Sequence, residues 1–215
     1  MGSHERARWM RFCGRLVLRA LGIRYRVEGT PPEEAALVVA NHLSYLDIVI
    51  AAAAMPCAFV ARHDVAEWPA FGTLARLGGT IFVDRASRRS AWRAANHIAK
   101  VLTEGVSVLF FPEGTSTDGS DMLRFNSPLF APAAEGGFRV VPMAIFYDPR
   151  GMALTERDLC WFGDDLFLPH LMRVLGVPGF HAMVRFGEEE AIPDRKAGAY
   201  RSYEAVAAMR NGGPR

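Results

Sequence analysis

Short apolar runs rich in β-branched residues alternate with helical patterns along most of the chain, and this alternation constrains the fold more than any other feature. The runs predict strands at residues 25–28, 37–40, 58–61, 80–83, 106–111, 140–146 and 182–186. The helical patterns predict helices near residues 46–55, 69–77, 88–103, 126–135, 165–175 and 196–210. A strand–helix–strand order places successive strands in parallel. The predicted fold class is therefore α/β, with a mostly parallel central sheet flanked by helices.

The length of 215 residues fits one domain with a sizeable core. Residues 25–210 contain no internal repeat or linker, so we expect them to form a single domain. Residues 1–24 precede it as a basic helix, and residues 211–215 have the Gly and Pro content of a frayed tail.

The basic helix is predicted from arginines that recur at steps of three and four in residues 8–23, with apolar side chains on the other faces. Two interpretations fit this pattern. The helix can pack its apolar side on the domain, or it can lie on an anionic membrane with Trp9 and Phe12 in the interface. We expect membrane association of residues 1–24, peripheral or monotopic, at the cytoplasmic face.

No membrane span and no signal peptide are expected. The longest uncharged apolar run, residues 48–61, is interrupted by Pro56 and is shorter than the roughly 18 to 20 residues that cross a bilayer. Arg11, Arg15 and Arg19 interrupt the apolar character that a signal peptide needs.

The charge and the cysteine and histidine content exclude several classes of function. A formal net charge of +2 does not favour a nucleic-acid partner. Three widely spaced cysteines without a CxxC pair suggest neither a disulfide framework nor a zinc site, and a reducing, cytoplasmic setting is expected. The histidines other than His42 fall at no ligand spacing, so no metal is predicted. The oligomeric state is left open by the sequence.

His42 and Asp47 are the first candidates for chemistry. His42 directly follows the predicted strand 37–40, and Asp47 comes five residues later. On one ideal helix this offset turns the two side chains about 140° apart, so they meet only if His42 precedes the helix. An Asp beside a His fixes its tautomer and lets it take a proton from an alcohol. Alternatively, both side chains cap local backbone groups.

Two further strand ends carry polar residues. Arg85 follows strand 80–83 and can bind a phosphate or carboxylate, or it can form an ion pair with a neighbouring acid. Glu113, Gly114 and Thr115 follow strand 106–111, where Glu113 can bind the hydroxyls of an acceptor. A plain turn explains the same residues.

Four blocks taken together resemble the bacterial lysophospholipid acyltransferases, which include the 1-acylglycerol-3-phosphate acyltransferases. The pattern N-H-x-x-x-x-D matches residues 41–47, and G-x-x-F-[VI]-D-R matches residues 79–85. The pattern F-P-E-G-T matches residues 111–115, and V-P matches residues 141–142. Arg62 stands where lysine is common in this family, and the resemblance covers roughly residues 25–190.

The resemblance implies a glycerolipid acyltransferase-like fold and direct acyl transfer from acyl-CoA or acyl-carrier protein to the hydroxyl of a lysolipid, without a cofactor or a covalent enzyme intermediate. Carried onto this chain, it makes His42 the general base and Asp47 the residue that orients it. Arg85 then holds the anionic group of the acceptor, and Glu113, Gly114 and Thr115 shape the acceptor site. The acceptor implied first is 1-acylglycerol-3-phosphate, which gives phosphatidate.

One departure from the family pattern opens a second acceptor. Many members that use phosphate acceptors continue the third block as E-G-T-R-S, whereas Ser116 takes the place of that arginine here. The variant is similar to members that acylate lyso-ornithine lipid or another lysophospholipid. An alternative of a different class is a non-catalytic lipid-binding protein on the same scaffold, which the basic residues 1–24 would also suit.

Overall fold

The structure is a computed structural model in which residues 1–68, 71–84 and 87–213 are described. The strands are β1 (Arg24–Glu28), β2 (Leu37–Ala40), β3 (Ala58–Arg62), β4 (Ile81–Val83), β5 (Val108–Phe110), β6 (Val140–Asp148) and β7 (His181–Phe186). The helices are α1 (Ser3–Ala20), α2 (Leu46–Ala54), α3 (Phe71–Leu77), α4 (Arg88–Thr103), α5 (Ala131–Gly136), α6 (Glu156–Leu159), α7 (Phe167–Leu175) and α8 (Arg195–Asn211). Two 3-10 turns, η1 (His63–Glu67) and η2 (Pro128–Phe130), complete the elements of the described residues.

The strands form one sheet of seven in the order β1-β7-β6-β2-β5-β3-β4. β2 pairs in parallel with both β5 and β6, and β3 pairs in parallel with β4 and β5. β7 runs antiparallel to β6, and β1 is parallel to β7. The carboxyl ends of β2 to β6 therefore lie at one edge of the sheet, together with the first residues of β1 and β7.

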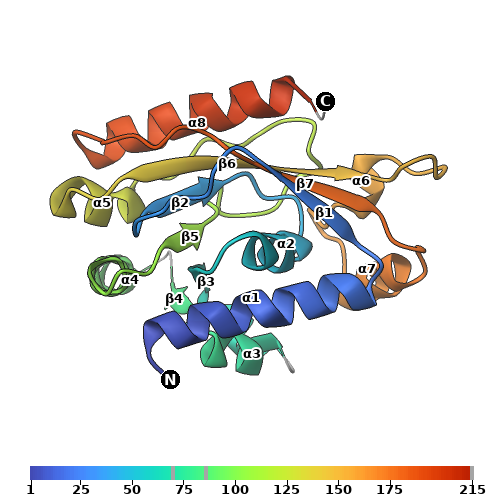
Figure 1. The fold of residues 1–215 in the computed structure, drawn as a ribbon, viewed down its shortest axis with the longest axis horizontal. Coiled ribbons are helices and arrows are strands. Elements are labelled where there is room, and N and C mark those ends of the chain that lie inside the picture. Colours follow the sequence, from blue (N-terminus) through green and yellow to red (C-terminus); the bar gives the residue numbers. More distant parts are fainter. Residues whose placement is uncertain (69–70, 85–86, 214–215) are drawn as a thin grey trace.

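Helices cover both faces of the sheet, as Figure 1 shows with α8 along one face and α1 along the other. Alternate residues of β2 enter different cores, because successive side chains of a strand point to opposite faces. Val38 and Ala40 pack with α2, while Leu37 and Val39 pack with residues of α4 and α8. Burial of both faces explains why the strands read as continuous apolar runs.

The predicted α/β class with a mostly parallel sheet is confirmed, and the differences concern the ends of elements, one divided helix and one additional short helix. α1 covers Ser3–Ala20 rather than residues 8–23. It begins early because the Glu5 carboxylate accepts the N–H of Gly2 at 2.9 Å, and it ends early because Gly22 turns left-handed with φ 68°. Residues 126–135 divide into η2 and α5. The four-residue helix α6 was not predicted, since one capped turn has no periodicity to detect.

At the carboxyl end of the chain, α8 runs to Asn211, and the carbonyl of Gly213 accepts a hydrogen bond from Arg185 at 2.9 Å. Residues 214–215 lie outside the described part of the chain.

α1 lies against α2 through its buried residues Gly14 and Leu18, whereas Ala7 belongs to the core cluster that contains residues of β3, β4 and α4. The approach is close at Gly14, where a Cβ atom would lie 2.9 Å from the carbonyl oxygen of Val49. The opposite side of α1 leaves Phe12, Leu16 and Val17 exposed. Packing on the domain thus uses one side of α1 only. Within the described residues, none of the helices combines the length and the apolarity that crossing a bilayer requires.

Gly14→Ala should push α1 away from α2, because the added methyl group meets backbone atoms that cannot turn aside. We expect a loss of about 1 to 3 kcal/mol in the free energy of unfolding, measured by denaturant titration. Gly212→Ala is the control, since its Cβ would lie no closer than 3.5 Å to a neighbour. Equal stability of the two variants would contradict the close α1–α2 contact.

Candidate active site

The site lies at the sheet edge where the parallel strands end. β2 stops at Ala40, and residues 41–45 lead into α2. The Asn41 side chain continues the pairing of β2 with β6: its amide donates to the Ile145 carbonyl at 3.1 Å, and its carbonyl oxygen accepts the Ile145 N–H at 2.8 Å. These two bonds fix the chain just before His42, so the local path of His42 is set by the sheet itself.

His42 and Asp47 meet as the sequence requires, with His42 ahead of α2 and Asp47 in its first turn. His42 Nδ1 lies 2.7 Å from Asp47 Oδ2. The Asp47 side chain is fully buried, whereas 17% of the His42 side chain is exposed. The histidine is therefore the member of the pair that a substrate can reach.

Asp47 is surrounded by hydrogen-bond donors. Its Oδ2 atom accepts the N–H of Leu43 at 2.6 Å and that of Ser44 at 2.9 Å, and its Oδ1 atom accepts the hydroxyl of Tyr147. A carboxylate in this setting only accepts, so the proton between the pair sits on His42 Nδ1. The other ring nitrogen, Nε2, then carries a lone pair that can accept a proton.

Tyr147 contributes its hydroxyl from the end of β6. Burial, and after it the neighbouring Asp47 carboxylate, raise the pKa of the Tyr147 hydroxyl well above its ordinary value. The hydroxyl therefore stays protonated near neutral pH and acts as a donor to Asp47.

Phe111 and Glu113, which follow β5, support His42 from another side. The rings of His42 and Phe111 stack with centroids 4.1 Å apart and an angle of 12°. The two Glu113 oxygens accept the backbone N–H of His42 at 2.7 Å and that of Leu123 at 2.8 Å. Burial raises the pKa of the Glu113 carboxyl, while these two N–H donors oppose the rise. Glu113 thus holds the backbone of His42 in place.

A cavity of about 220 Å³ opens beside His42. Its walls come from the ends of β3 and β5, from α2, from η1 and from the segment after α6. The lining residues are His42, Ile48, Val60, Ala61, Arg62, Asp64, Val65, Trp68, Phe111, Gly114, Thr115, Ser116, Trp161, Phe162 and Gly163. We call this volume the His42 cavity. It combines aromatic and aliphatic walls with a few polar groups, as ligand sites commonly do.

The charged groups that line the His42 cavity are paired. Arg62 donates to both oxygens of Asp64, at 2.9 Å from Nε and 2.7 Å from the terminal nitrogen. The Ser116 hydroxyl donates to the Trp161 carbonyl. In the described part of the chain, the backbone N–H groups of Thr115 and Ser116 have no hydrogen-bond acceptor. They are donors at the cavity wall.

The structure brings most of the predicted site residues together. His42 and Asp47 form a pair, and Gly114 and Thr115 line the His42 cavity. Glu113 lies behind the cavity with both oxygens engaged by the backbone, so its contact with an acceptor stays a prediction. Arg85 lies outside the described residues.

Tyr147 was missed because the predicted strand ended at residue 146, one position short. β6 continues to Asp148, which places Tyr147 at the same sheet edge as His42. A polar residue directly after a predicted parallel strand is the signal that was available. No comparable sequence signal pointed to the other cavity residues, which are the Arg62–Asp64 pair and Trp161. Among the described residues, no cluster of three or more His, Cys, Asp and Glu side chains suits a metal ion.

The sheet and the buried His42–Asp47 pair at its carboxyl edge define an α/β protein with a histidine–carboxylate site. The sequence profile of the Acyltransferase family matches residues 23–146. The chain belongs to this family.

Similar proteins carry two different acceptor names. The lyso-ornithine lipid O-acyltransferase of Rhizobium meliloti is 37% identical, and the alignment covers 84% of this chain and 66% of that protein. The enzyme of the same name from Brucella abortus is 38% identical over 86% of this chain and 75% of its own length. The 1-acyl-sn-glycerol-3-phosphate acyltransferase of Neisseria meningitidis is 37% identical over 64% of this chain and 55% of its own length.

A solved structure shares the fold. The crystal structure of the 1-acyl-sn-glycerophosphate (LPA) acyltransferase PlsC from Thermotoga maritima matches with a TM-score of 0.72, covering 96% of this chain and 78% of that chain at 21% sequence identity. At this identity the likeness shows the fold alone.

Tyr147→Phe removes one donor from the buried Asp47 carboxylate without changing the ring. We expect the free energy of unfolding to fall by about 1.5 to 3 kcal/mol, because a buried charged acceptor loses a hydrogen bond. Denaturant titration measures this loss. Tyr203→Phe is the control for loss of a tyrosine hydroxyl, since in the described residues the Tyr203 hydroxyl has no hydrogen-bond partner and its partly buried ring packs against Phe125. Matching losses in both variants would rule out the Tyr147–Asp47 bond.

Proposed function

We propose that the chain transfers a fatty acyl group from a thioester donor to the hydroxyl of a lysolipid, with His42 as the general base. The observation that carries the proposal is the 2.7 Å contact of His42 Nδ1 with the buried Asp47, which leaves Nε2 as the ring nitrogen available at the cavity. Family membership supports the same reaction class. Acyl-CoA and acyl-carrier protein are both suitable donors, and each is a substrate rather than a cofactor.

In the proposed reaction, His42 Nε2 takes the proton of the acceptor hydroxyl as its oxygen attacks the carbonyl carbon of the thioester. Asp47 stabilises the imidazolium that forms. The amides of Thr115 and Ser116 are our candidates to donate to the developing oxyanion, since both residues line the His42 cavity and their N–H groups have no hydrogen-bond acceptor among the described residues. The tetrahedral intermediate then collapses and its carbon–sulfur bond breaks. His42 gives the proton to the departing thiolate. The products are the ester and a free thiol.

For the acceptor, we propose a zwitterionic headgroup of the lyso-ornithine type. The Arg62–Asp64 pair presents a cation and an anion side by side at the His42 cavity. An ornithine headgroup offers a carboxylate and an ammonium group that match these charges. Ser116, which stands where the phosphate-using members have arginine, adds no positive charge, and its hydroxyl is turned to Trp161. Similar proteins named lyso-ornithine lipid O-acyltransferase support this choice.

Lysophosphatidate is the second candidate acceptor. Arg62 supplies a guanidinium at the cavity that can bind a phosphate bidentately. In this case the phosphate would have to displace the Asp64 carboxylate from Arg62. The similar 1-acyl-sn-glycerol-3-phosphate acyltransferase of Neisseria meningitidis favours this acceptor.

We also propose that the protein works on a membrane surface, since its acceptor resides there. Large apolar side chains remain exposed on three helices. They are Phe12, Leu16 and Val17 of α1, Phe71, Leu74 and Leu77 of α3, and Leu168, Met172 and Leu175 of α7. Phe167 links α7 to α3 and to the cavity, because its ring centroid lies 5.3 Å from that of Phe71 and 5.1 Å from that of Trp68. A lysolipid that leaves the membrane here reaches the cavity along apolar side chains.

His42→Ala should lower kcat by about 10²- to 10⁴-fold, because the acceptor hydroxyl loses its base. The measurement is acyl transfer by purified enzyme, with acyl-CoA or acyl-carrier protein and a lysolipid. His97→Ala, on the exposed side of α4, is the control and should retain activity. Unchanged transfer by His42→Ala would remove the catalytic assignment and leave the non-catalytic lipid-binding alternative.

Asp64→Asn should discriminate between the two acceptors. With lyso-ornithine lipid, kcat/KM should fall about tenfold because the ammonium group loses its anionic partner. With lysophosphatidate it should hold or rise, because Arg62 is released from its ion pair. Asp165→Asn is the matched control, since Asp165 is a similarly exposed acid that pairs with Arg173 and does not line the cavity. An equal fall for both acceptors would contradict the zwitterion proposal.

A further inference from the structure

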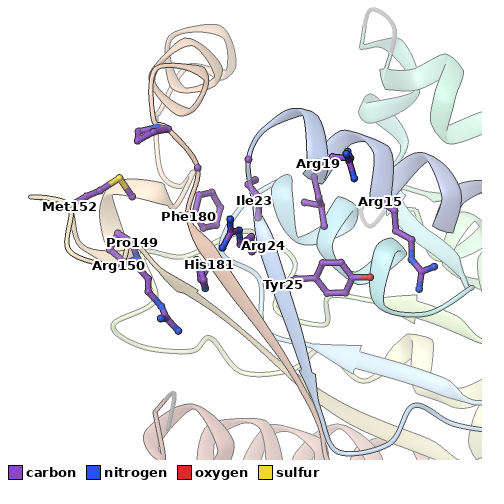
Figure 2. A pocket seen from close by; sticks show the side chains of 14 residues that line it. Arg15, Arg19, Ile23, Arg24, Tyr25, Pro149, Arg150, Met152, Phe180 and His181 are labelled. Atoms are coloured by element: carbon purple, nitrogen blue, oxygen red, sulfur yellow. The ribbon is translucent and has the colours of Figure 1, made fainter.

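A second and larger cavity, of about 1030 Å³, lies where α1 turns into β1. Its cationic residues are Arg15, Arg19, Arg24 and Arg150, and we call it the cationic cavity. Figure 2 shows side chains from α1, β1, β7 and the connection after β6 gathered around it. The cationic cavity and the His42 cavity have no lining residue in common.

The charge of the cationic cavity is only partly neutralised. No carboxylate lines it among the described residues. Arg19 and Arg24, both exposed, form no ion pair with a described residue, and Arg15 uses one nitrogen to donate to the Ala53 carbonyl at 3.3 Å. Arg150 pairs with Asp148, which is not part of the lining. An anion that enters therefore meets two guanidinium groups, those of Arg19 and Arg24, that have no carboxylate partner among the described residues.

Part of the wall of the cationic cavity is apolar and is formed by closely packed segments of the fold. Leu18, Ile23 and Phe180 are buried there. The turn at Gly22 packs backbone against backbone on the turn at Gly179, where an added Cβ would lie 2.2 Å from the Gly22 carbonyl oxygen. The N–H of Arg24 also donates to the Phe180 carbonyl at 3.0 Å. The walls are thus built by the fold and do not depend on a ligand to form.

We propose that the cationic cavity binds the phosphate group of an anionic phospholipid headgroup in the membrane. Guanidinium groups suit phosphate because they donate two parallel hydrogen bonds to it. The apolar walls suit the glycerol and ester region of a lipid, which a free phosphate ion lacks. The exposed Leu16 and Val17 lie on the same helix as Arg15 and Arg19, so the helix that offers the arginines also offers apolar side chains to the bilayer.

The phosphates of coenzyme A share this chemistry, but a lipid accounts for more of the observations. The polar nucleotide of coenzyme A would not bury the exposed apolar side chains of α1, whereas a bilayer would. A donor bound in the cationic cavity would also have to deliver its thioester to a separate cavity. The proposed lipid site goes beyond the proposed function and stands whether or not His42 is the base.

The test is a double substitution, Arg19→Gln with Arg24→Gln, in the full chain. The probe is a short-chain phosphatidylglycerol kept below its micelle concentration, with binding followed by calorimetry. We expect the double variant to bind at least about tenfold more weakly, because it loses two guanidinium groups that can donate charge-assisted hydrogen bonds to the phosphate. Arg93→Gln with Arg139→Gln removes the same charge from exposed residues outside the cationic cavity and should bind as the unmodified chain does.

Competition distinguishes the sources of phosphate. Inorganic phosphate and coenzyme A should each fail to displace the short-chain lipid at concentrations equal to that of the lipid. Displacement by coenzyme A would overturn the proposal in favour of a donor site, and displacement by inorganic phosphate would reduce the cavity to a general anion site. Equal weakening in both double variants would also overturn it, because binding would then follow net charge rather than the cavity.

Discussion

The buried carboxylate of Asp47 is the constraint on which the site depends. An ionised carboxylate in a protein interior is costly unless donors surround it. Here the donors are the amides of Leu43 and Ser44, the Tyr147 hydroxyl and the His42 ring. They come from the loop after β2 and from the end of β6. The hydrogen bonds to this one charge therefore fix the loop after β2, the first turn of α2 and the His42 ring together. The same geometry that stabilises the buried charge also positions the histidine.

The parallel sheet explains why the remaining site residues converge. β2, β3, β5 and β6 end at one edge, and each strand contributes a residue at or just beyond its end: His42 after β2, Arg62 at the end of β3, Phe111 after β5 and Tyr147 near the end of β6. Ligands in open α/β sheets bind at this edge for the same reason. Asn41 makes the arrangement firm, because its amide pairs with the backbone of Ile145 where β2 itself has ended.

The fold was predictable because β2, β5 and β6 are buried on both faces, and such strands leave continuous apolar runs in the sequence. The His42–Asp47 pair was predictable in part. The spacing of the two residues required His42 to precede the helix. The spacing alone is a weak pattern, and the sequence blocks at residues 79–85, 111–115 and 141–142 made it more significant. The contacts of Glu113 were not predictable. A polar residue after a strand gives the same sequence pattern whether its side chain faces a ligand or the backbone of His42. The Arg62–Asp64 pair was hidden because η1, which supplies Asp64, is a short 3-10 turn without periodicity.

One aromatic pair lies between the Asp47 carboxylate and the cationic cavity. The rings of Tyr147 and Phe180 lie with centroids 5.2 Å apart. Tyr147 donates to Asp47 on the side of the His42 cavity, and Phe180 forms a wall of the cationic cavity. Protein interiors are close-packed, so a displacement of one ring is felt by its neighbour. A headgroup bound as proposed in the cationic cavity would contact Phe180, whose ring packs on the tyrosine that donates to Asp47.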